Sequence, residues 1–214
     1  MFQRLGALSA SAPATRRRRP RQRRSIETVE AILEAAAQVF ERHGYAAGTT
    51  NRIAARAGIS VGSLYQYFAD KDDILVALVE RHLDEGAAML EPVMRGLLEE
   101  PPPVHVALGL LADSLLELHR HRPNLHRVLF EEAPRPPSLR ARLDATFDAA
   151  ADSLAAYLAL RPELAICDRR LAAELVVQAL EAITHGLVIH PRSEVPAEEY
   201  AREAVTLCER YLAG

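Results

Sequence analysis

The sequence predicts an all-α fold in which an N-terminal three-helix domain with a helix-turn-helix precedes a larger helical body. Apolar residues recur at helical spacing along most of the chain, and no alternating strand pattern occurs. Residues 48–67 are typical of two short helices joined by a glycine turn. Prolines cluster between the apolar segments, where they end one helix before the next begins.

A first helix is predicted over residues 25–42. Ser25 is suited to cap its start, and Glu27 is favourable near the positive end of the helix dipole. The pattern stops at His43 and Gly44. The apolar side chains that share one face are Val29, Ile32, Leu33, Ala36, Val39 and Phe40.

The helix-turn-helix is predicted over residues 48–67. Thr49 or Thr50 can cap its first helix, because a threonine oxygen accepts the free amide hydrogens of a helix start. Gly58 stands at the turn, since glycine takes positive φ without steric cost. Ser60 can cap the second helix. The side chains that face inward are Ile53, Ala54, Ala57, Leu64 and Phe68.

The side chains left facing outward suit nucleic acid. Gln66 can pair with adenine, Ser63 can bond several bases, and Val61 can touch a thymine methyl. Tyrosine hydroxyls such as that of Tyr65 are typical partners of backbone phosphates. Lys71 is the chain's only lysine and comes at a predicted helix start, a position that also suits a phosphate. The alternatives are two ordinary packed helices and a lysine that merely lies at the surface.

Residues 25–83 also resemble the DNA-binding domain of the TetR family of transcriptional regulators. The matching groups are Ile32-Leu33-Glu34-Ala35-Ala36, Val39-Phe40, Gly44-Tyr45, Thr49-Thr50, Ile53-Ala54, Ala57-Gly58-Ile59-Ser60, Gly62, Leu64-Tyr65-Gln66-Tyr67-Phe68, Lys71 and Ile74-Leu75. The resemblance implies that a first set of residues binds backbone phosphates: Thr49, Thr50, Tyr65, Tyr67 and Lys71. It places a second set nearest the bases: Val61, Gly62, Ser63 and Gln66. Ser60 is also expected among the DNA-binding residues. Many relatives carry histidine at the position of Tyr67, and a phenol can still reach a phosphate.

A fourth helix is predicted to start at the capping residue Asp70 and to run to about Leu90, before an interruption at Pro92. It would link the helix-turn-helix domain (residues 25–83) to the body (residues 84–214). Further helices are predicted in the body over residues 104–121, 124–132, 138–160, 168–189 and 197–212.

The helix predicted over residues 168–189 is apolar on most sides and needs two partners. One partner is its own body. We expect the other to be the same region of a second subunit, in a four-helix bundle. The family resemblance implies such a homodimer, and the alternative is a central helix buried within one monomer.

Charge is distributed unevenly along the chain. Residues 1–24 contain eight arginines and no acid, so their formal net charge is +8. Because the whole chain carries −3, the remaining residues carry −11. We expect this segment to be a disordered basic arm that contacts DNA, rather than an incidental extension. The two cysteines suggest no disulfide framework. We expect no apolar run to span a bilayer, and hence a bacterial cytoplasmic protein, nucleoid-associated when bound to DNA, without membrane contact.

The resemblance implies a repressor that binds double-stranded DNA at a palindromic operator and is released by a small-molecule effector. An apolar pocket would favour a lipophilic effector. Candidates for lining it, each with plain core as the alternative, are Met89, Met94, Leu111, Leu115, His119, Leu129, Phe130, Phe147 and Tyr157. Two other functions remain open: a non-specific architectural DNA-binding protein, and an enzyme, although catalytic motifs are absent from the sequence.

Three histidines are candidate metal ligands: His119, His121 and His126. No cysteine or acidic residue follows them at a recognisable ligand spacing. We therefore expect them at the surface around the Arg122-Pro123 turn, and we expect neither a metal nor a cofactor.

Overall fold

The computed structural model describes residues 23–132, 134–190 and 194–214. Within these ranges every regular element is helical, which confirms the all-α prediction. In chain order the elements are α1 (Arg23–Ala47), α2 (Thr50–Ala57), α3 (Val61–Leu64), α4 (Lys71–Glu99), α5 (Val104–Arg120), α6 (Pro123–Arg127), the π-helical turn η1 (Val128–Glu132), α7 (Pro137–Ala159), α8 (Arg169–Ile189) and α9 (Ala197–Ala213). The predicted arm lies outside the described residues, except for Arg23 and Arg24, which begin α1.

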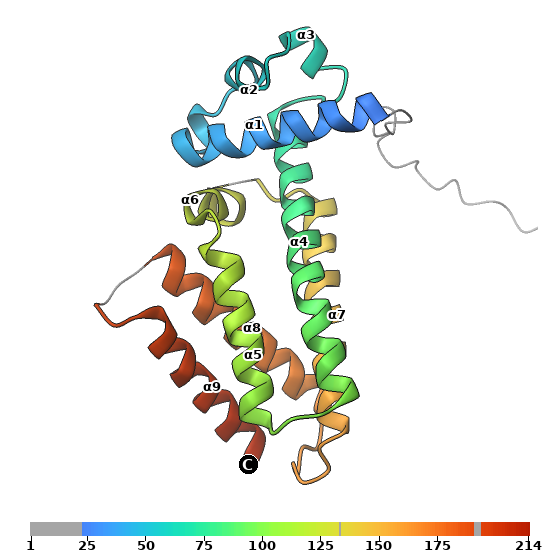
Figure 1. The fold of residues 1–214 in the computed structure, drawn as a ribbon, viewed down its shortest axis with the longest axis vertical. Helices are drawn as coiled ribbons and strands as arrows, with labels where there is room; N and C mark the ends of the chain where they lie inside the picture. Colours follow the sequence, from blue (N-terminus) through green and yellow to red (C-terminus); the bar gives the residue numbers. More distant parts are fainter. Residues whose placement is uncertain (1–22, 133, 191–193) are drawn as a thin grey trace, which may run out of the picture.

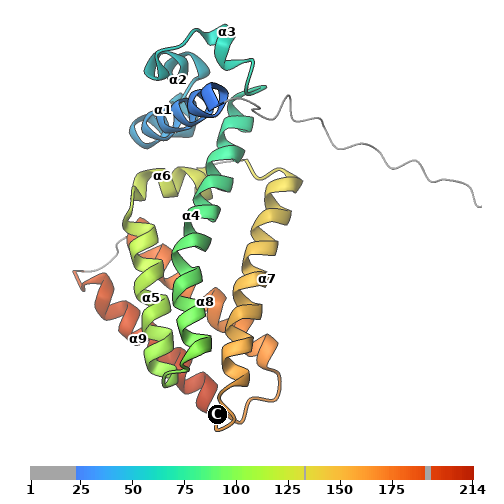
Figure 2. The ribbon, with the colours of Figure 1, turned by 45° about the vertical axis from the view of Figure 1, so that its right-hand side comes forward.

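Helices α1, α2 and α3 lie together at one end of the molecule, and the helices of the body extend away from them (Figure 1). Helix α4 runs from the helix-turn-helix domain down the length of the body, with α5 and α7 beside it (Figure 2). Helix α6 lies across the top of the body, directly below α1. The two parts of the protein therefore meet at α1, α4 and α6.

Two apolar cores stabilise these parts. The first core is built from α1 to α4, and it includes Leu125, Val128, Leu129 and Leu139 from α6, η1 and α7. The second core lies between α5, α7, α8 and α9. Because the first core takes side chains from both sides of residue 83, the helix-turn-helix domain is packed onto the body rather than linked to it by α4 alone.

Helix α4 differs from its predicted bounds. It continues through Pro92 to Glu99, where the sequence predicts an interruption. Proline removes only one backbone donor, and Leu97, only 2% exposed, packs into the second core beyond it. The burial of Leu97 therefore favours a continuous helix across the proline.

Helix α8 is long and apolar enough to cross a bilayer by length and composition, contrary to the expectation that no apolar run reaches this length. In the fold it packs against α5, α7 and α9. Its residues Ala172, Ala173, Val176 and Leu180 are buried in the second core, whereas Leu171 and Leu175 are exposed. One side of α8 therefore packs within the body.

Candidate nucleic-acid interface

Local hydrogen bonds fix the shape of the helix-turn-helix. The Thr49 side chain accepts a bond from the backbone N–H of Arg52 at 3.3 Å, which caps α2. Gly58 ends α2 in the left-handed conformation, with φ of 70° and ψ of 28°. The Ser60 hydroxyl then accepts the backbone N–H of Ser63 at 3.0 Å and caps α3. The predicted caps Thr49 and Ser60 and the turn glycine Gly58 are confirmed. The predicted cap Ser25 is wrong, because α1 already begins at Arg23.

The inward and outward faces of this unit separate as the sequence predicts. Ile53, Ala54, Leu64 and Phe68 are buried in the first core. Gly62, Tyr65 and Gln66 are exposed, as are Thr49 and Ser60, and the partly buried members of the candidate set are Thr50, Val61, Ser63, Tyr67 and Lys71. Helix α3 itself ends at Leu64, and residues 65–67 continue as hydrogen-bonded turns rather than as the longer helix expected. All ten candidate DNA-binding residues lie in this end of the molecule (Figure 1).

Three of the candidate phosphate ligands are held by contacts within the protein. The hydroxyls of Thr50 and Tyr65 lie 3.2 Å apart, which joins α2 to the turn after α3. Lys71 donates from Nζ to the carbonyl of Tyr45 at 2.9 Å and lies 3.8 Å from the centre of the Tyr45 ring. The ammonium keeps further donors after this bond, so Lys71 is positioned at the start of α4 and can still bind an anion.

Tyr45 is itself anchored by its hydroxyl, which donates to the carboxylate of Asp72. Burial raises the pKa of the Tyr45 phenol well above its ordinary value, and the Asp72 carboxylate raises that pKa further. The phenol therefore remains a protonated donor, and the link between the end of α1 and the start of α4 persists across the physiological pH range.

A chain of polar contacts runs from α2 to the body. Arg56 of α2 donates to the Gln38 side chain at 2.6 Å, and Gln38 donates to Glu34 at 2.8 Å. Glu34 accepts both terminal nitrogens of Arg122, at 2.6 and 3.3 Å. The last of these contacts joins positions 88 residues apart, so no local spacing in the sequence reveals it.

The Glu34–Arg122 pair is the centre of this junction. Arg122 precedes α6 with φ of 59° and ψ of 63°, and it is the only described non-glycine residue with positive φ. Hydrogen bonding to Arg122 lowers the pKa of the Glu34 carboxyl, and the same contact raises the pKa of Arg122. Nearby, the backbone N–H of Tyr45 donates to the Glu132 carboxylate of η1 at 3.0 Å. Helix α1 is therefore tied to the body at two separate points.

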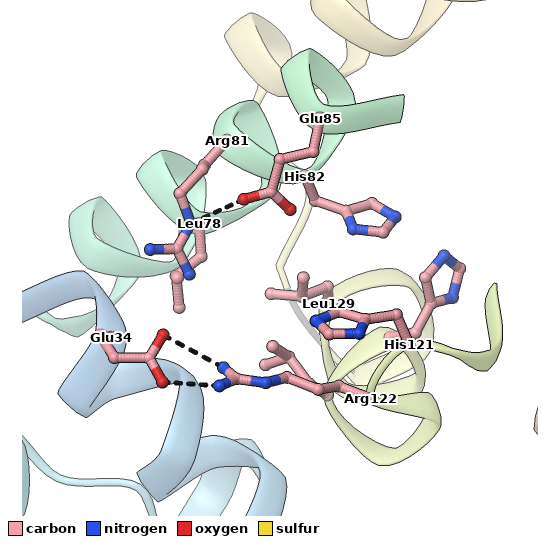
Figure 3. Close-up of a pocket in the computed structure, with 10 residues that line it drawn as sticks. Glu34, Leu78, Arg81, His82, Glu85, His121, Arg122 and Leu129 are labelled. Carbon is pink, nitrogen blue, oxygen red and sulfur yellow. Dashed lines mark hydrogen bonds and ion pairs between the residues drawn. The ribbon is translucent and has the colours of Figure 1, made fainter. Parts of the chain in front are cut away.

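A pocket of about 150 Å³ lies at this junction (Figure 3). Its walls come from α1, α4 and the α5–α6 region, and they carry charged and imidazole groups beside a few leucines. The residues that line it are Glu34, Leu78, Arg81, His82, Glu85, His121, Arg122, Leu125, His126 and Leu129. This pocket is more polar than the effector pocket expected from the sequence.

Of the nine candidate pocket residues, Leu129 alone lines this pocket. Tyr157 is fully buried, and its hydroxyl donates to the carbonyl of Pro102 at 2.6 Å. Met89 and Phe147 are exposed. Buried or partly buried positions are taken by Met94, Leu111, Leu115, His119 and Phe130. A second pocket of about 310 Å³, between the end of α4 and the start of α5, is lined by Pro92, Val93, Gly96, Leu97, Glu100, Pro102, Val106 and Leu110 and by none of the nine.

The histidines differ from their predicted surface placement. His121 is exposed, as expected, but His119 and His126 are 0% and 2% exposed, so that part of the prediction is wrong. Both are buried because α5 and α6 pack against α8, which places His119 beside Glu181 and His126 beside His185.

Comparison with known proteins places both parts of the chain in one family. Residues 32–78 match bacterial regulatory proteins of the tetR family, and residues 103–212 match the tetracyclin repressor-like C-terminal domain. The HTH-type transcriptional activator FasR of Mycolicibacterium smegmatis is 27% identical over 124 residues, which cover 58% of this chain and 55% of that protein. The HTH-type transcriptional repressor AcnR of Corynebacterium efficiens is 33% identical over 84 residues, or 36% and 43% of the two chains. The chain thus spans about half the length of the curated relatives it matches.

Solved structures extend the likeness to most of the chain. A regulator from Mesorhizobium loti assigned to the TetR family is 25% identical, with a TM-score of 0.72 over 90% of this chain and 98% of that one. The multidrug binding protein EbrR, complexed with imidazole, is 27% identical, with a TM-score of 0.64 over 84% and 93% of the two chains. The fold of both parts, and their arrangement in one chain, is therefore shared with these proteins.

Proposed function

This chain belongs to the TetR family of DNA-binding transcriptional regulators, and we propose that it acts as a homodimeric repressor that a small-molecule effector releases from a palindromic operator. Its relatives include both a repressor and an activator, and repression is the outcome we propose here. The observation that carries the proposal is the separation of faces in the helix-turn-helix. Leu64 and Phe68 are buried, while Gly62, Tyr65 and Gln66 of the same segment are exposed.

This exposed face has the chemistry and the size to enter a major groove. Val61, Gly62, Ser63 and Gln66 lie at the base edges in this proposal, and the amide of Gln66 recognises adenine. Phosphates on either side are bound by Thr49, Thr50, Ser60, Tyr65, Tyr67 and Lys71. The start of α4 adds the positive end of a long helix at Lys71.

Dimerisation through α8 and α9 accounts for apolar side chains that the monomer leaves in water. The two helices pack against each other, and each exposes large apolar residues. These residues, each 38% exposed or more, are Leu171, Leu175, Tyr200, Leu207 and Tyr211. A twofold pair would bury them and present two helix-turn-helix units to two half-sites, about one turn of DNA apart.

The effector acts by favouring a body conformation whose two helix-turn-helix units do not fit both half-sites. By linkage, operator DNA then weakens effector binding by the same factor, and a coupling of about 1–3 kcal/mol suffices for a clear switch. EbrR, which shares this fold, is a multidrug binding protein in complex with imidazole. This likeness supports a small molecule as the effector class. The nine candidate residues for lining the effector pocket remain a prediction. The lipophilic character of the effector is also a prediction.

Operator binding by the purified protein tests the proposal. Footprinting on genomic DNA should yield an inverted-repeat site, and that site should bind roughly 1,000-fold more tightly, or better, than random duplex of equal length. Gln66→Ala should cost about 1–3 kcal/mol at one position of each half-site. Glu99→Ala, an exposed polar residue at the far end of α4 and outside the proposed dimer interface, should leave binding unchanged.

Two experimental results would change the proposed function. Equal affinity for operator and random DNA would favour an architectural protein and overturn the proposal. Higher transcription from the bound promoter in the presence of the protein would identify an activator instead. We place the protein in the bacterial cytoplasm, at the nucleoid when it is bound to DNA, so the transcription assay belongs in bacterial cells.

A further inference from the structure

Three histidines from three separate helices meet inside the body, behind the junction with the helix-turn-helix domain. His119 lies near the end of α5, His126 lies on α6 and His185 lies on α8. One ring nitrogen from each lies within 4.8 Å of the other two. The ring centres of His119 and His126 are 4.7 Å apart, and those of His126 and His185 are 4.9 Å apart.

Two of these rings carry a buried nitrogen that has no hydrogen-bond partner among the described residues. These atoms are Nδ1 of His119 and Nδ1 of His126. A buried polar atom is normally hydrogen-bonded, and an orphaned one calls for an explanation such as an ion. An apolar residue would fill either position without leaving such an atom unpaired.

Neighbouring carboxylates orient the rings as they do around metal ligands. Nε2 of His119 lies 3.2 Å from Glu181, so a proton on Nε2 leaves the lone pair on the orphaned Nδ1. Nε2 of His185 lies 3.5 Å from Glu131. A histidine ligand typically donates its other ring N–H to a carboxylate in this way.

We propose that His119, His126 and His185 form a binding site for a divalent first-row transition ion, of which Zn²⁺ is the best match. Three imidazoles with a fourth position open to water are a ligand set that Zn²⁺ takes. His126 also lines the junction pocket, together with His82, which gives the ion a route in from solvent. This proposal replaces the expectation of no metal drawn from the sequence.

Occupation of the site moves α6, and this second step depends on the proposed function. Ligands of tetrahedral Zn²⁺ at about 2.0–2.1 Å from the ion lie about 3.4 Å from one another, closer than the 4.8 Å within which these nitrogens now lie. Coordination therefore draws α5, α6 and α8 together. Because Arg122 leads into α6 and binds Glu34 of α1, the contraction is felt by the helix-turn-helix domain.

Metal uptake by the full chain, without DNA and without a polyhistidine tag, tests the site. The protein carries Cys167→Ser, which removes an exposed thiol, and is stripped with a chelator before addition of Zn²⁺ or Co²⁺. One ion should bind per chain, Co²⁺ should give the visible absorption of a nitrogen-ligated site, and Zn²⁺ at about 100 times its Kd should raise Tm by about 5–10 °C.

Matched variants decide whether the three histidines hold the ion. His126→Phe keeps an aromatic ring stacked on Phe130, and His185→Ala changes a half-buried position if the first variant fails to fold. Both should lose uptake and the shift in Tm, whereas His121→Ala should keep them. Absence of stoichiometric uptake by the parent protein, or equal uptake by His126→Phe, would overturn the site.

Operator affinity with and without Zn²⁺ tests the coupling separately. A change of about fivefold or more in the parent protein, absent from both His126→Phe and Arg122→Ala, supports it. Uptake that leaves operator affinity unaltered overturns the coupling and leaves the site intact. Operator binding measured without metal reports on the proposed function alone.

Discussion

Arg122 of the body binds Glu34 of α1 through both terminal guanidinium nitrogens, and it does so from a left-handed backbone conformation. A non-glycine residue in this conformation carries a steric cost of about 1–2 kcal/mol. Arg122, which bears this cost, lies where the helix-turn-helix domain contacts the body. Strained backbone is often found at functional sites, and the consequences of this one can be measured.

Replacing Arg122 by glycine and by alanine separates the ion pair from the strain. Neither variant can bind Glu34, but only glycine adopts a φ of 59° without steric cost. We expect Arg122→Gly to be more stable than Arg122→Ala by about 1 kcal/mol in urea unfolding. Arg142→Ala, which breaks an exposed ion pair with Asp84, should change stability by less than about 0.5 kcal/mol. Equal stability of the two Arg122 variants would mean that α6 relaxes around the change.

The Glu34–Arg122 coupling should depend on pH. Hydrogen bonding to Arg122 lowers the pKa of Glu34 in the folded protein, so the pair stabilises the fold above about pH 4.3, the ordinary value for glutamate. That stabilisation is lost as the pH falls through the lowered pKa. A double-mutant cycle with Glu34→Gln and Arg122→Gln should give about 1 kcal/mol or less at pH 7, because both side chains are partly exposed. The coupling should vanish in acid, and a coupling that persists there would exclude the charge as its source.

Three glycines should respond differently to alanine. Gly58→Ala should destabilise by about 1 kcal/mol, because φ is 70° there although no atom lies within 4 Å of the added Cβ. Gly48→Ala should cost several times more, since its Cβ would lie 2.4 Å from Phe40. Gly109→Ala, in the open interior of α5, should be neutral or stabilise by up to about 1 kcal/mol. Thermal unfolding of the three variants checks this order.

Tyr65→Phe and Lys71→Ala should weaken binding to operator and random DNA alike. Each change removes a proposed phosphate ligand, but only Lys71→Ala removes a positive charge. The slope of log K against log salt should therefore fall by about 1 for Lys71→Ala and stay unchanged for Tyr65→Phe. Arg95→Ala, an exposed cation far along α4 that pairs with Glu91, is the matched control. An unchanged slope for Lys71→Ala would mean that its contacts with Tyr45 are its whole role.

Charged substitutions on α8 and α9 should yield monomers. Leu175→Glu or Leu207→Arg places a charge at a position that is 45% or 59% exposed in the single chain, so folding should survive while the proposed interface does not. Sedimentation should detect half the mass, and operator affinity should fall with it. Leu98→Glu, at a 40% exposed leucine on α4, should leave the mass unchanged. A parent protein that sediments as a single chain would contradict the homodimer directly.

Features that depend on neighbouring residues could be predicted from the sequence. The caps at Thr49, Ser60 and Asp70 and the turn at Gly58 follow from the chemistry of single side chains, and the structure confirms them. The end of α3 at Leu64 could not be predicted, because the apolar spacing of Leu64 and Phe68 fits a helix and also fits the tighter turns that occur.

Features that depend on distant contacts could not be predicted. Glu34 and Arg122 are 88 residues apart, and His119 and Glu181 are 62 apart, so neither pair has a local signature. The polar turn beside His119 and His126 favoured a surface placement for both, and only the packing of α5 and α6 against α8 buries them. The pocket at the junction likewise depends on how separate helices meet, which periodicity within one helix does not specify.

Helix α4 has a mechanical consequence that follows from its continuity. Its 29 residues make a rod about 44 Å long, and its first turns belong to the first core. A tilt of about five degrees at the far end would carry Lys71 sideways by about 4 Å, roughly the rise of one base pair. Rotations too small to disturb the packing of the lower helices would thus suffice to move one subunit of the proposed dimer out of register with its proposed half-site.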